Sequence, residues 1–151
     1  MFGATDVLGA RTADTDGLVL HSEVQIGDST VTIADRKPGW PYTPAFVRVY
    51  VEDPAATLKR AAAGGARMIS QPTDFLGDVL ARFADPFGHL WWVYKHNPSA
   101  ATGTTPRATL QWATRSARAN KSWESFVTPE LTYVHTTLME VMASLRDPRA
   151  R

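Results

Sequence analysis

The stretch that decides the fold runs from Pro44 to His96 and reads PAFVRVYVEDPAATLKRAAAGGARMISQPTDFLGDVLARFADPFGHLWWVYKH. Its opening segment, Ala45 to Val51, is rich in β-branched and aromatic residues, which is typical of a strand. Asp53 is a suitable N-cap residue for a helix, and Gly64 is a suitable residue to end it. We therefore predict a strand followed directly by a helix.

Three further strands are predicted after the helix, at Arg67 to Ser70, Val79 to Ala84 and His89 to Tyr94. The segment 71–78 separates the first two, and the tight turn Asp85-Pro86-Phe87-Gly88 separates the last two. The predicted order of this unit is βαβββ.

A hairpin is predicted before this unit. Residues alternate in polarity from Leu18 to Ile26 and again from Thr30 to Ala34, and the turn-forming pair Gly27-Asp28 lies between them. An earlier strand is predicted around Thr5 to Thr12, and a proline-rich linker, 38–44, leads into the second unit.

The C-terminal part, residues 97–151, has helical spacing and is rich in Ala, Thr and Arg. Thr128 and Pro129 predict the start of an amphipathic helix that ends near Asp147-Pro148, and a shorter helix is predicted at 108–119. The apolar face of the longer helix consists of Leu131, Val134, Leu138, Val141, Met142 and Leu145. We expect this face to pack on its own domain or on a second copy of the chain.

Composition excludes several classes of protein. The 151 residues include sixteen Lys or Arg and fifteen Asp or Glu, so the net charge of +1 indicates neither nucleic acid nor an anionic membrane as a partner. The chain has no cysteine, which excludes disulfides, thiol nucleophiles and Cys-ligated metals. No apolar stretch is long enough to span a membrane and the N-terminus carries no targeting signal, so we expect a cytoplasmic protein.

Three motifs resemble the glyoxalase/bleomycin-resistance family, also called the vicinal oxygen chelate superfamily, in its branch with a DPFGH turn. They are HSEVQIGDSTVTIAD (21–35), FVRVYVEDP (46–54) with its Ala-rich helix, and FLGD (75–78) followed by DPFGH (85–89). The resemblance covers roughly residues 2–96. It implies an α+β fold in which paired βαβββ modules form a curved, cup-shaped mixed sheet whose concavity holds the ligand. We therefore predict a domain over 1–96 and a helical C-terminal extension over 97–151.

The first module departs from the family pattern. Residues 44–96 supply a complete βαβββ unit, whereas residues 1–43 supply only the three trailing strands. Either the start of the chain has been placed too late, or another element covers the exposed edge and face of this half. We expect the helix within 128–151, from the same or a second chain, to fill this vacancy. We also expect a homodimer, because the resemblance implies modules paired across dimers.

The resemblance also allows a test for metal binding. Metal-dependent members of the family use His, Gln or Glu from the concave strands, and the corresponding positions here fall near Thr32, at Phe46 and at Trp92. The ligand position on the opening strand has no counterpart. We therefore predict no family-type metal site and no cofactor.

Alternation along the strand at 45–51 places Phe46, Arg48 and Tyr50 on the cup side, and the last strand adds Trp92 and Tyr94. A cation among aromatic rings suits an anionic or planar ligand, and an internal pairing of Arg48 with Glu23 is the open alternative. Trp40, in the linker, is predicted to cover the rim of the cup or to pack on the surface.

His21 and Glu23 share one face of the hairpin strand, two residues apart. They could form a general acid/base couple, in which the Glu orients the imidazole, or they could be ordinary polar residues of an exposed strand.

These observations favour a metal-independent protein that binds a small planar or hydrophobic molecule in an aromatic-lined cup. One rival is an enzyme of the same superfamily, of the lyase, isomerase or dioxygenase type, that uses His21 and Glu23 or a divalent metal. Another is an interaction module that pairs with a second chain through its exposed edge.

Overall fold

The computed structural model describes residues 1–75, 77–95 and 128–150, and the chain divides into two compact units. Unit 1 is Met1–Thr43 and unit 2 is Pro44–Arg151. The α+β fold class predicted from the sequence is confirmed. No helix in the described part of the chain has the length and apolar character needed to cross a membrane.

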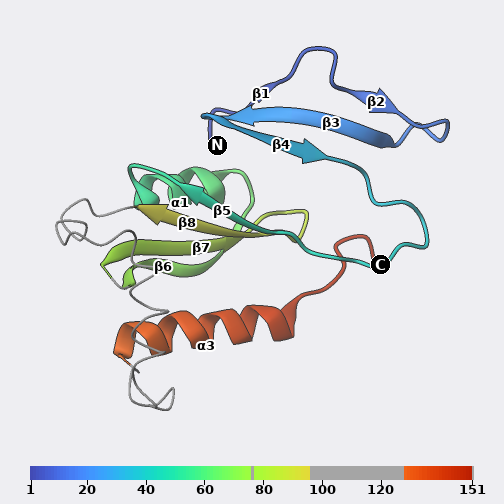
Figure 1. The fold of residues 1–151 in the computed structure, drawn as a ribbon. Helices are drawn as coiled ribbons and strands as arrows, with labels where there is room; N and C mark the ends of the chain where they lie inside the picture. Colours follow the sequence, from blue (N-terminus) through green and yellow to red (C-terminus); the bar gives the residue numbers. More distant parts are fainter. Residues whose placement is uncertain (76, 96–127, 151) are drawn as a thin grey trace, which may run out of the picture. The chain divides into compact units, whose positions relative to one another are not determined.

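Unit 2 is built on a four-stranded sheet in the order β5-β8-β7-β6. Its strands are β5 (Phe46–Tyr50), β6 (Arg67–Phe75), β7 (Asp78–Ala84) and β8 (Leu90–Lys95). β5 runs parallel to β8, whereas β7 is antiparallel to both β6 and β8. The predicted βαβββ order is confirmed (Figure 1).

Helix α1 (Pro54–Ala63) begins and ends where the sequence predicted. The Asp53 carboxylate accepts a hydrogen bond from the Ala56 N–H at 2.9 Å, which caps the first turn. Gly64 ends the helix, and Gly65 follows with a φ of 86°, a conformation that favours glycine. The buried side of α1 packs on the sheet through residues that include Thr57, Leu58 and Ala61.

Asp85 organises the turn between β7 and β8. Its Oδ1 accepts hydrogen bonds from the Phe87 and His89 N–H groups, both at 2.9 Å, and its Oδ2 accepts one from the Trp91 indole at 2.9 Å. The His89 Nδ1 in turn accepts a hydrogen bond from the Ala45 N–H at 3.0 Å. The turn therefore fixes the start of β5 beside β8.

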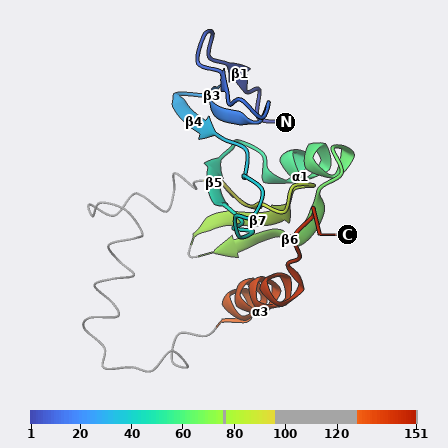
Figure 2. The same ribbon diagram turned by 90° about the vertical axis from the view of Figure 1, so that its right-hand side faces the viewer.

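Helix α3 (Pro129–Ser144) lies on the opposite side of this sheet from α1 (Figures 1 and 2). Two apolar clusters join it to the sheet, and each contains one buried valine of the helix. The buried residues of these clusters are Leu80, Tyr94 and Val134 in one, and Ala84, Leu90 and Val141 in the other. We call this side of the unit 2 sheet the α3 side.

The position of α3 differs from the expectation that this helix covers the incomplete first module. It packs on the second sheet, because β7 and β8 place an apolar surface on the α3 side that matches the stripe of the helix. The predicted helix at 108–119 and the predicted boundary at residue 96 lie outside the described residues.

Unit 1 is a small sheet around its longest strand, β3 (Val19–Ile26). β4 (Ser29–Ile33) pairs with it as the predicted hairpin. The single strand predicted around Thr5 to Thr12 is wrong: two short strands, β1 (Thr5–Asp6) and β2 (Thr12–Ala13), pair with β3 instead. The chain turns between them at Gly9, which has a φ of 79°.

Strand β6 is longer than predicted, since it continues through Pro72 to Phe75. Proline cannot donate a ladder hydrogen bond, but β6 is the outermost strand of the sheet and its register shifts on either side of Ser70. An edge position therefore tolerates a residue that the sequence pattern placed in a loop.

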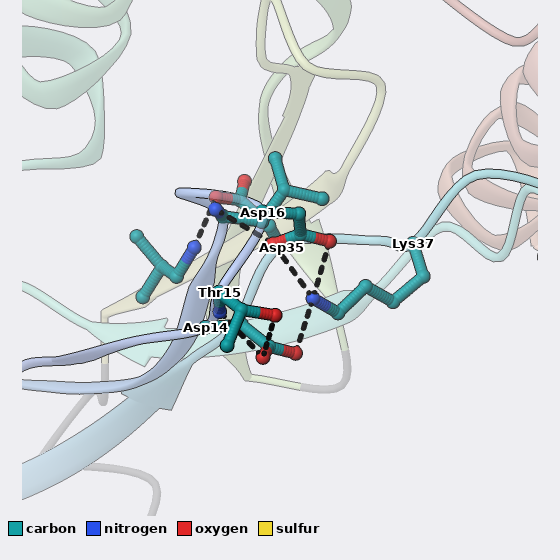
Figure 3. A network of polar contacts seen from close by, with 7 residues as sticks. Asp14, Thr15, Asp16, Asp35 and Lys37 are labelled. Atoms are coloured by element: carbon teal, nitrogen blue, oxygen red, sulfur yellow. Dashed lines mark hydrogen bonds and ion pairs between the residues drawn. The ribbon is translucent and has the colours of Figure 1, made fainter.

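A polar network holds the two ends of the unit 1 hairpin together (Figure 3). The Lys37 ammonium donates to Asp14 Oδ2 at 2.6 Å and to Asp16 Oδ2 at 2.8 Å. Asp35 Oδ2 accepts a hydrogen bond from the Val19 N–H at 2.8 Å. We call these contacts the Lys37 clamp; they join the turn before β3 to the chain that follows β4.

Candidate ligand-binding site

Strand β5 presents the side chains of every second residue, Phe46, Arg48 and Tyr50, on the α3 side of the sheet. Phe46 and Tyr50 are 52% and 53% exposed, and Arg48 between them is exposed as well. Val47 and Val49 alternate with them and are half-buried. The predicted division of this strand into a valine face and a Phe-Arg-Tyr face is confirmed.

Strand β8 places two of the predicted aromatic residues beside this row. Arg48 is the register partner of Trp92, and Tyr50 is the partner of Tyr94. The Arg48 guanidinium lies 4.7 Å from the centre of the Tyr94 ring, and the Tyr50 and Tyr94 rings are 5.8 Å apart. Trp92 and Tyr94 stack with their centres 6.4 Å apart. The structure therefore brings together five of the predicted site residues.

Two further polar residues on the α3 side were missed by the sequence analysis. Arg82 on β7 is the register partner of Trp92, and Ser70 on β6 is the register partner of Arg82. Both are buried, and the Arg82 guanidinium lies 5.3 Å from the centre of the Trp92 ring. The signal was a single charged residue in the otherwise apolar segment VLARFA (79–84).

Burial changes the ionisation of two groups at this site. Burial raises the pKa of the Tyr94 phenol, and the nearby Arg48 and Arg82 only partly oppose the effect. Burial also lowers the pKa of the Arg82 guanidinium, but arginine stays charged at neutral pH. At neutral pH the site therefore combines two cations with neutral aromatic rings.

The predicted pair His21 and Glu23 is formed in unit 1. The His21 Nε2 and Glu23 Oε1 atoms are 3.1 Å apart, and both side chains are partly exposed. Glu23 lies opposite Thr32 on β4, so this side of the sheet is polar. Trp40, also in unit 1, is 62% exposed.

The residues present do not fit the metal that metal-dependent relatives bind. Phe46 and Trp92 stand at two of the expected ligand positions, and neither a phenyl ring nor an indole N–H can ligate a divalent ion. Across residues 1–75, 77–95 and 128–150, no three His, Asp or Glu side chains gather in a way that could hold one.

Comparison with known families identifies the superfamily of the chain. Residues 5–93, more than half of the chain, match the family described as Glyoxalase/Bleomycin resistance protein/Dioxygenase superfamily. The chain therefore belongs to this superfamily, as the motifs of the hairpin, of strand β5 and of the DPFGH turn predicted.

Solved structures of other proteins are similar to this chain. TioX from Micromonospora sp. ML1 is 28% identical, with a TM-score of 0.49, over 64% of this chain and 81% of TioX. Protein PA1353 from Pseudomonas aeruginosa is 20% identical, with a TM-score of 0.49, over 63% of this chain and 80% of that protein. No curated protein matches the chain.

Proposed function

We propose that this protein binds a planar, anionic small molecule without a metal, on the face formed by Phe46, Arg48 and Tyr50. The observation that carries this proposal is the position of Arg48, which is exposed and lies over the Tyr94 ring. A ligand carboxylate can pair with the guanidinium, and its ring can stack on the exposed aromatic side chains.

Three features support this class of ligand. Large aromatic side chains are half exposed on an edge strand, where a ligand would bury their apolar area. Arg48 forms no ion pair with any carboxylate among the described residues of unit 2. Binding of this kind needs only a preformed surface and one charged contact, so no catalytic group is required.

The test compares two probes of nearly the same shape, 2-naphthoate and its neutral amide, 2-naphthamide. We expect Arg48→Gln to weaken 2-naphthoate binding about tenfold and to leave 2-naphthamide unchanged, because a charged hydrogen bond is lost. Lys59→Gln is the matched control, since it removes an exposed cation from α1 on the other side of the sheet. Equal affinity for both probes, or a loss in the control, would contradict the proposal.

An enzyme of the same superfamily is the second candidate, favoured by the 3.1 Å contact between His21 and Glu23. Such a pair can move a proton at neutral pH. The measurement is deuterium exchange at the C–H groups of a panel of α-keto and α-hydroxy acids, followed by NMR. Exchange that is abolished by His21→Gln and retained by His135→Gln would establish this activity; no exchange with the wild-type protein would exclude it for these acids.

We further propose that the protein is a homodimer and that it acts in the cytoplasm. Leu20 and Ile33 on the unit 1 sheet are 54% and 48% exposed, and a second copy would bury such side chains. Native mass spectrometry across a range of concentrations tests the dimer, and a monomer throughout would contradict it. Cell fractionation tests the location.

A further inference from the structure

One cross-strand row on the α3 side carries two arginines. The register of the sheet aligns Ser70 on β6, Arg82 on β7, Trp92 on β8 and Arg48 on β5. Neighbouring strands are about 4.8 Å apart, so the backbones at the two arginines are about 10 Å apart, with Trp92 between them. We call these four residues the arginine row.

Neither arginine of the row pairs with a carboxylate among the described residues of unit 2. Each lies instead over an aromatic ring, Arg48 over Tyr94 and Arg82 over Trp92. Arg82 is only 1% exposed, so water cannot compensate its charge. A buried cation without an anion is unfavourable, and a second one nearby on the same face adds to the positive potential.

Helix α3 supplies the hydrogen bonds that Arg82 does make. The Arg82 Nη2 donates to the Val134 carbonyl and, at 2.7 Å, to Thr137 Oγ1. Both acceptors are neutral, and the Val134 carbonyl belongs to the helix backbone. The helix thus solvates one nitrogen of the guanidinium without neutralising its charge.

The remaining polar atoms of the row have no partner. Among the described residues, the buried side-chain nitrogen and oxygen atoms without a hydrogen bond are Ser70 Oγ, Arg82 Nε, Arg82 Nη1 and Trp92 Nε1. All of them belong to the arginine row. Buried polar groups are normally paired, so this concentration marks a place where an acceptor is missing. Each of these atoms can donate a hydrogen bond, which is what an oxyanion requires.

We infer that the arginine row binds a planar aromatic ligand with two acidic groups, one held by Arg48 and the other by Arg82, Ser70 and Trp92 in place of α3. This inference rests on the proposed function, which needs only Arg48 and one acidic group. It adds the chemical class of the ligand, a planar diacid, and a second anion site beneath the helix.

The geometry of a guanidinium explains why α3 must lose a hydrogen bond to Arg82 when the second acidic group binds. A carboxylate binds arginine through a pair of nitrogens, and both such pairs on the guanidinium include Nη2. Nη2 is the atom that already donates to Val134 and Thr137. The carboxylate therefore takes over at least one of these hydrogen bonds, and the contact between the helix and the sheet loosens there.

The experiment uses the full chain and two probes, 2,6-naphthalenedicarboxylate and 2-naphthoate. We expect the diacid to bind the wild-type protein about tenfold more tightly than the monoacid, because it gains a second charged contact. Hydrogen exchange should then report α3: backbone amides of residues 129–144 should exchange faster with the diacid than with the monoacid or without ligand.

A matched pair of variants separates this site from the rest of the helix. Thr137→Ala removes one acceptor that competes for Arg82, so it should raise the affinity for the diacid about fivefold and leave the monoacid unchanged. Thr136→Ala changes the exposed neighbour on the same helix and should change neither. Arg82→Met should abolish the advantage of the diacid; if this variant fails to fold, the two threonine variants still decide the question.

The outcomes distinguish the two proposals. Binding of 2-naphthoate that depends on Arg48, with no advantage for the diacid and no change in α3 exchange, would overturn the second site and retain the proposed function. Failure of both probes to bind the wild-type protein and the Thr137→Ala variant would overturn both. Tight binding of the diacid by Thr137→Ala alone would support the second site, because the helix would then be the barrier.

Discussion

The two units keep a sheet together by different means. All the buried apolar residues of the described chain lie in unit 2, where α1 and α3 cover the two sides of the sheet. Unit 1 has no buried residue among its 43, and the Lys37 clamp and the pairing with β3 hold its strands. The comparison shows that the sheet with a helix on each side has a buried core, whereas residues 1–43, which form strands and no helix, have none.

The largest difference between the units is expected when one leucine in each is truncated to alanine. Leu80→Ala in unit 2 should lower the free energy of unfolding by about 2–5 kcal/mol, because this fully buried side chain leaves a cavity. Leu20→Ala in unit 1 should change it by less than about 0.5 kcal/mol, because this side chain is already half exposed. Urea unfolding followed by circular dichroism measures both.

Equal losses for the two leucine variants would contradict the assignment of the core to unit 2. A loss at Leu20 that appears only at high protein concentration would instead indicate that a second copy covers unit 1 in solution.

Removal of one turn carboxylate from each unit should change the unfolding free energy by an intermediate amount. Asp85→Ala should cost about 2 kcal/mol of unfolding free energy, since it leaves the Phe87 and His89 N–H groups and the Trp91 indole without an acceptor. Asp28→Ala, in the turn of the unit 1 hairpin, removes only a contact with the Ser29 hydroxyl and should cost about 0.5 kcal/mol. Thermal unfolding of both variants provides the measurement, and a larger loss at Asp28 would refute this ranking.

The smallest expected effect is the pH dependence of the stability that the Lys37 clamp contributes. Hydrogen bonds from Lys37 hold the pKa values of Asp14 and Asp16 below the ordinary value of 3.8, so their contribution to stability is present above that pH and is lost as the pH falls through the lowered values. The same contacts raise the pKa of Lys37 above 10.5, so its contribution is present below 10.5 and is lost as the pH rises through the raised value.

The variant Lys37→Gln tests this range. It should move the pKa values of the Asp14 and Asp16 carboxyls back toward 3.8, as followed by NMR titration, whereas Lys59→Gln should leave them unchanged. Carboxyl pKa values that do not move in Lys37→Gln would show that the clamp does not form in solution.

Local patterns predicted most of the fold. The cap at Asp53, the glycine after α1 and the Asp85 turn are short-range features, and the structure has each of them where the sequence placed it. Strand β6 was predicted too short because its continuation depends on a tertiary fact, the edge position that tolerates Pro72. The sheet on which α3 packs was likewise a question of tertiary contact, since the apolar stripe fits any apolar surface of the right width.

The candidate site was predicted only in part, because its remaining residues also depend on tertiary contacts. Alternation placed Phe46, Arg48, Tyr50, Trp92 and Tyr94 on one face, and the register of β5 and β8 confirms that they adjoin. Arg82 was overlooked because the role of a single charged residue in an apolar strand cannot be inferred until its neighbours in the sheet are known. Its burial under α3 and its alignment with Ser70 and Trp92 emerge only from the sheet.

The parallel pairing of β5 with β8 also has a consequence for the order in which the protein assembles. The hairpins that join β6, β7 and β8 close over short stretches of chain, whereas β5 must wait for a partner that lies 44 residues further on. Closing a long loop costs more entropy than closing a hairpin, so the non-local pairing is expected to be slow. During synthesis the ribosome releases Phe46, Arg48 and Tyr50 well before β8 has emerged. Strand β5, which bears the exposed arginine, is thus the first strand of its sheet to be synthesised, and we expect it to be the last to pair.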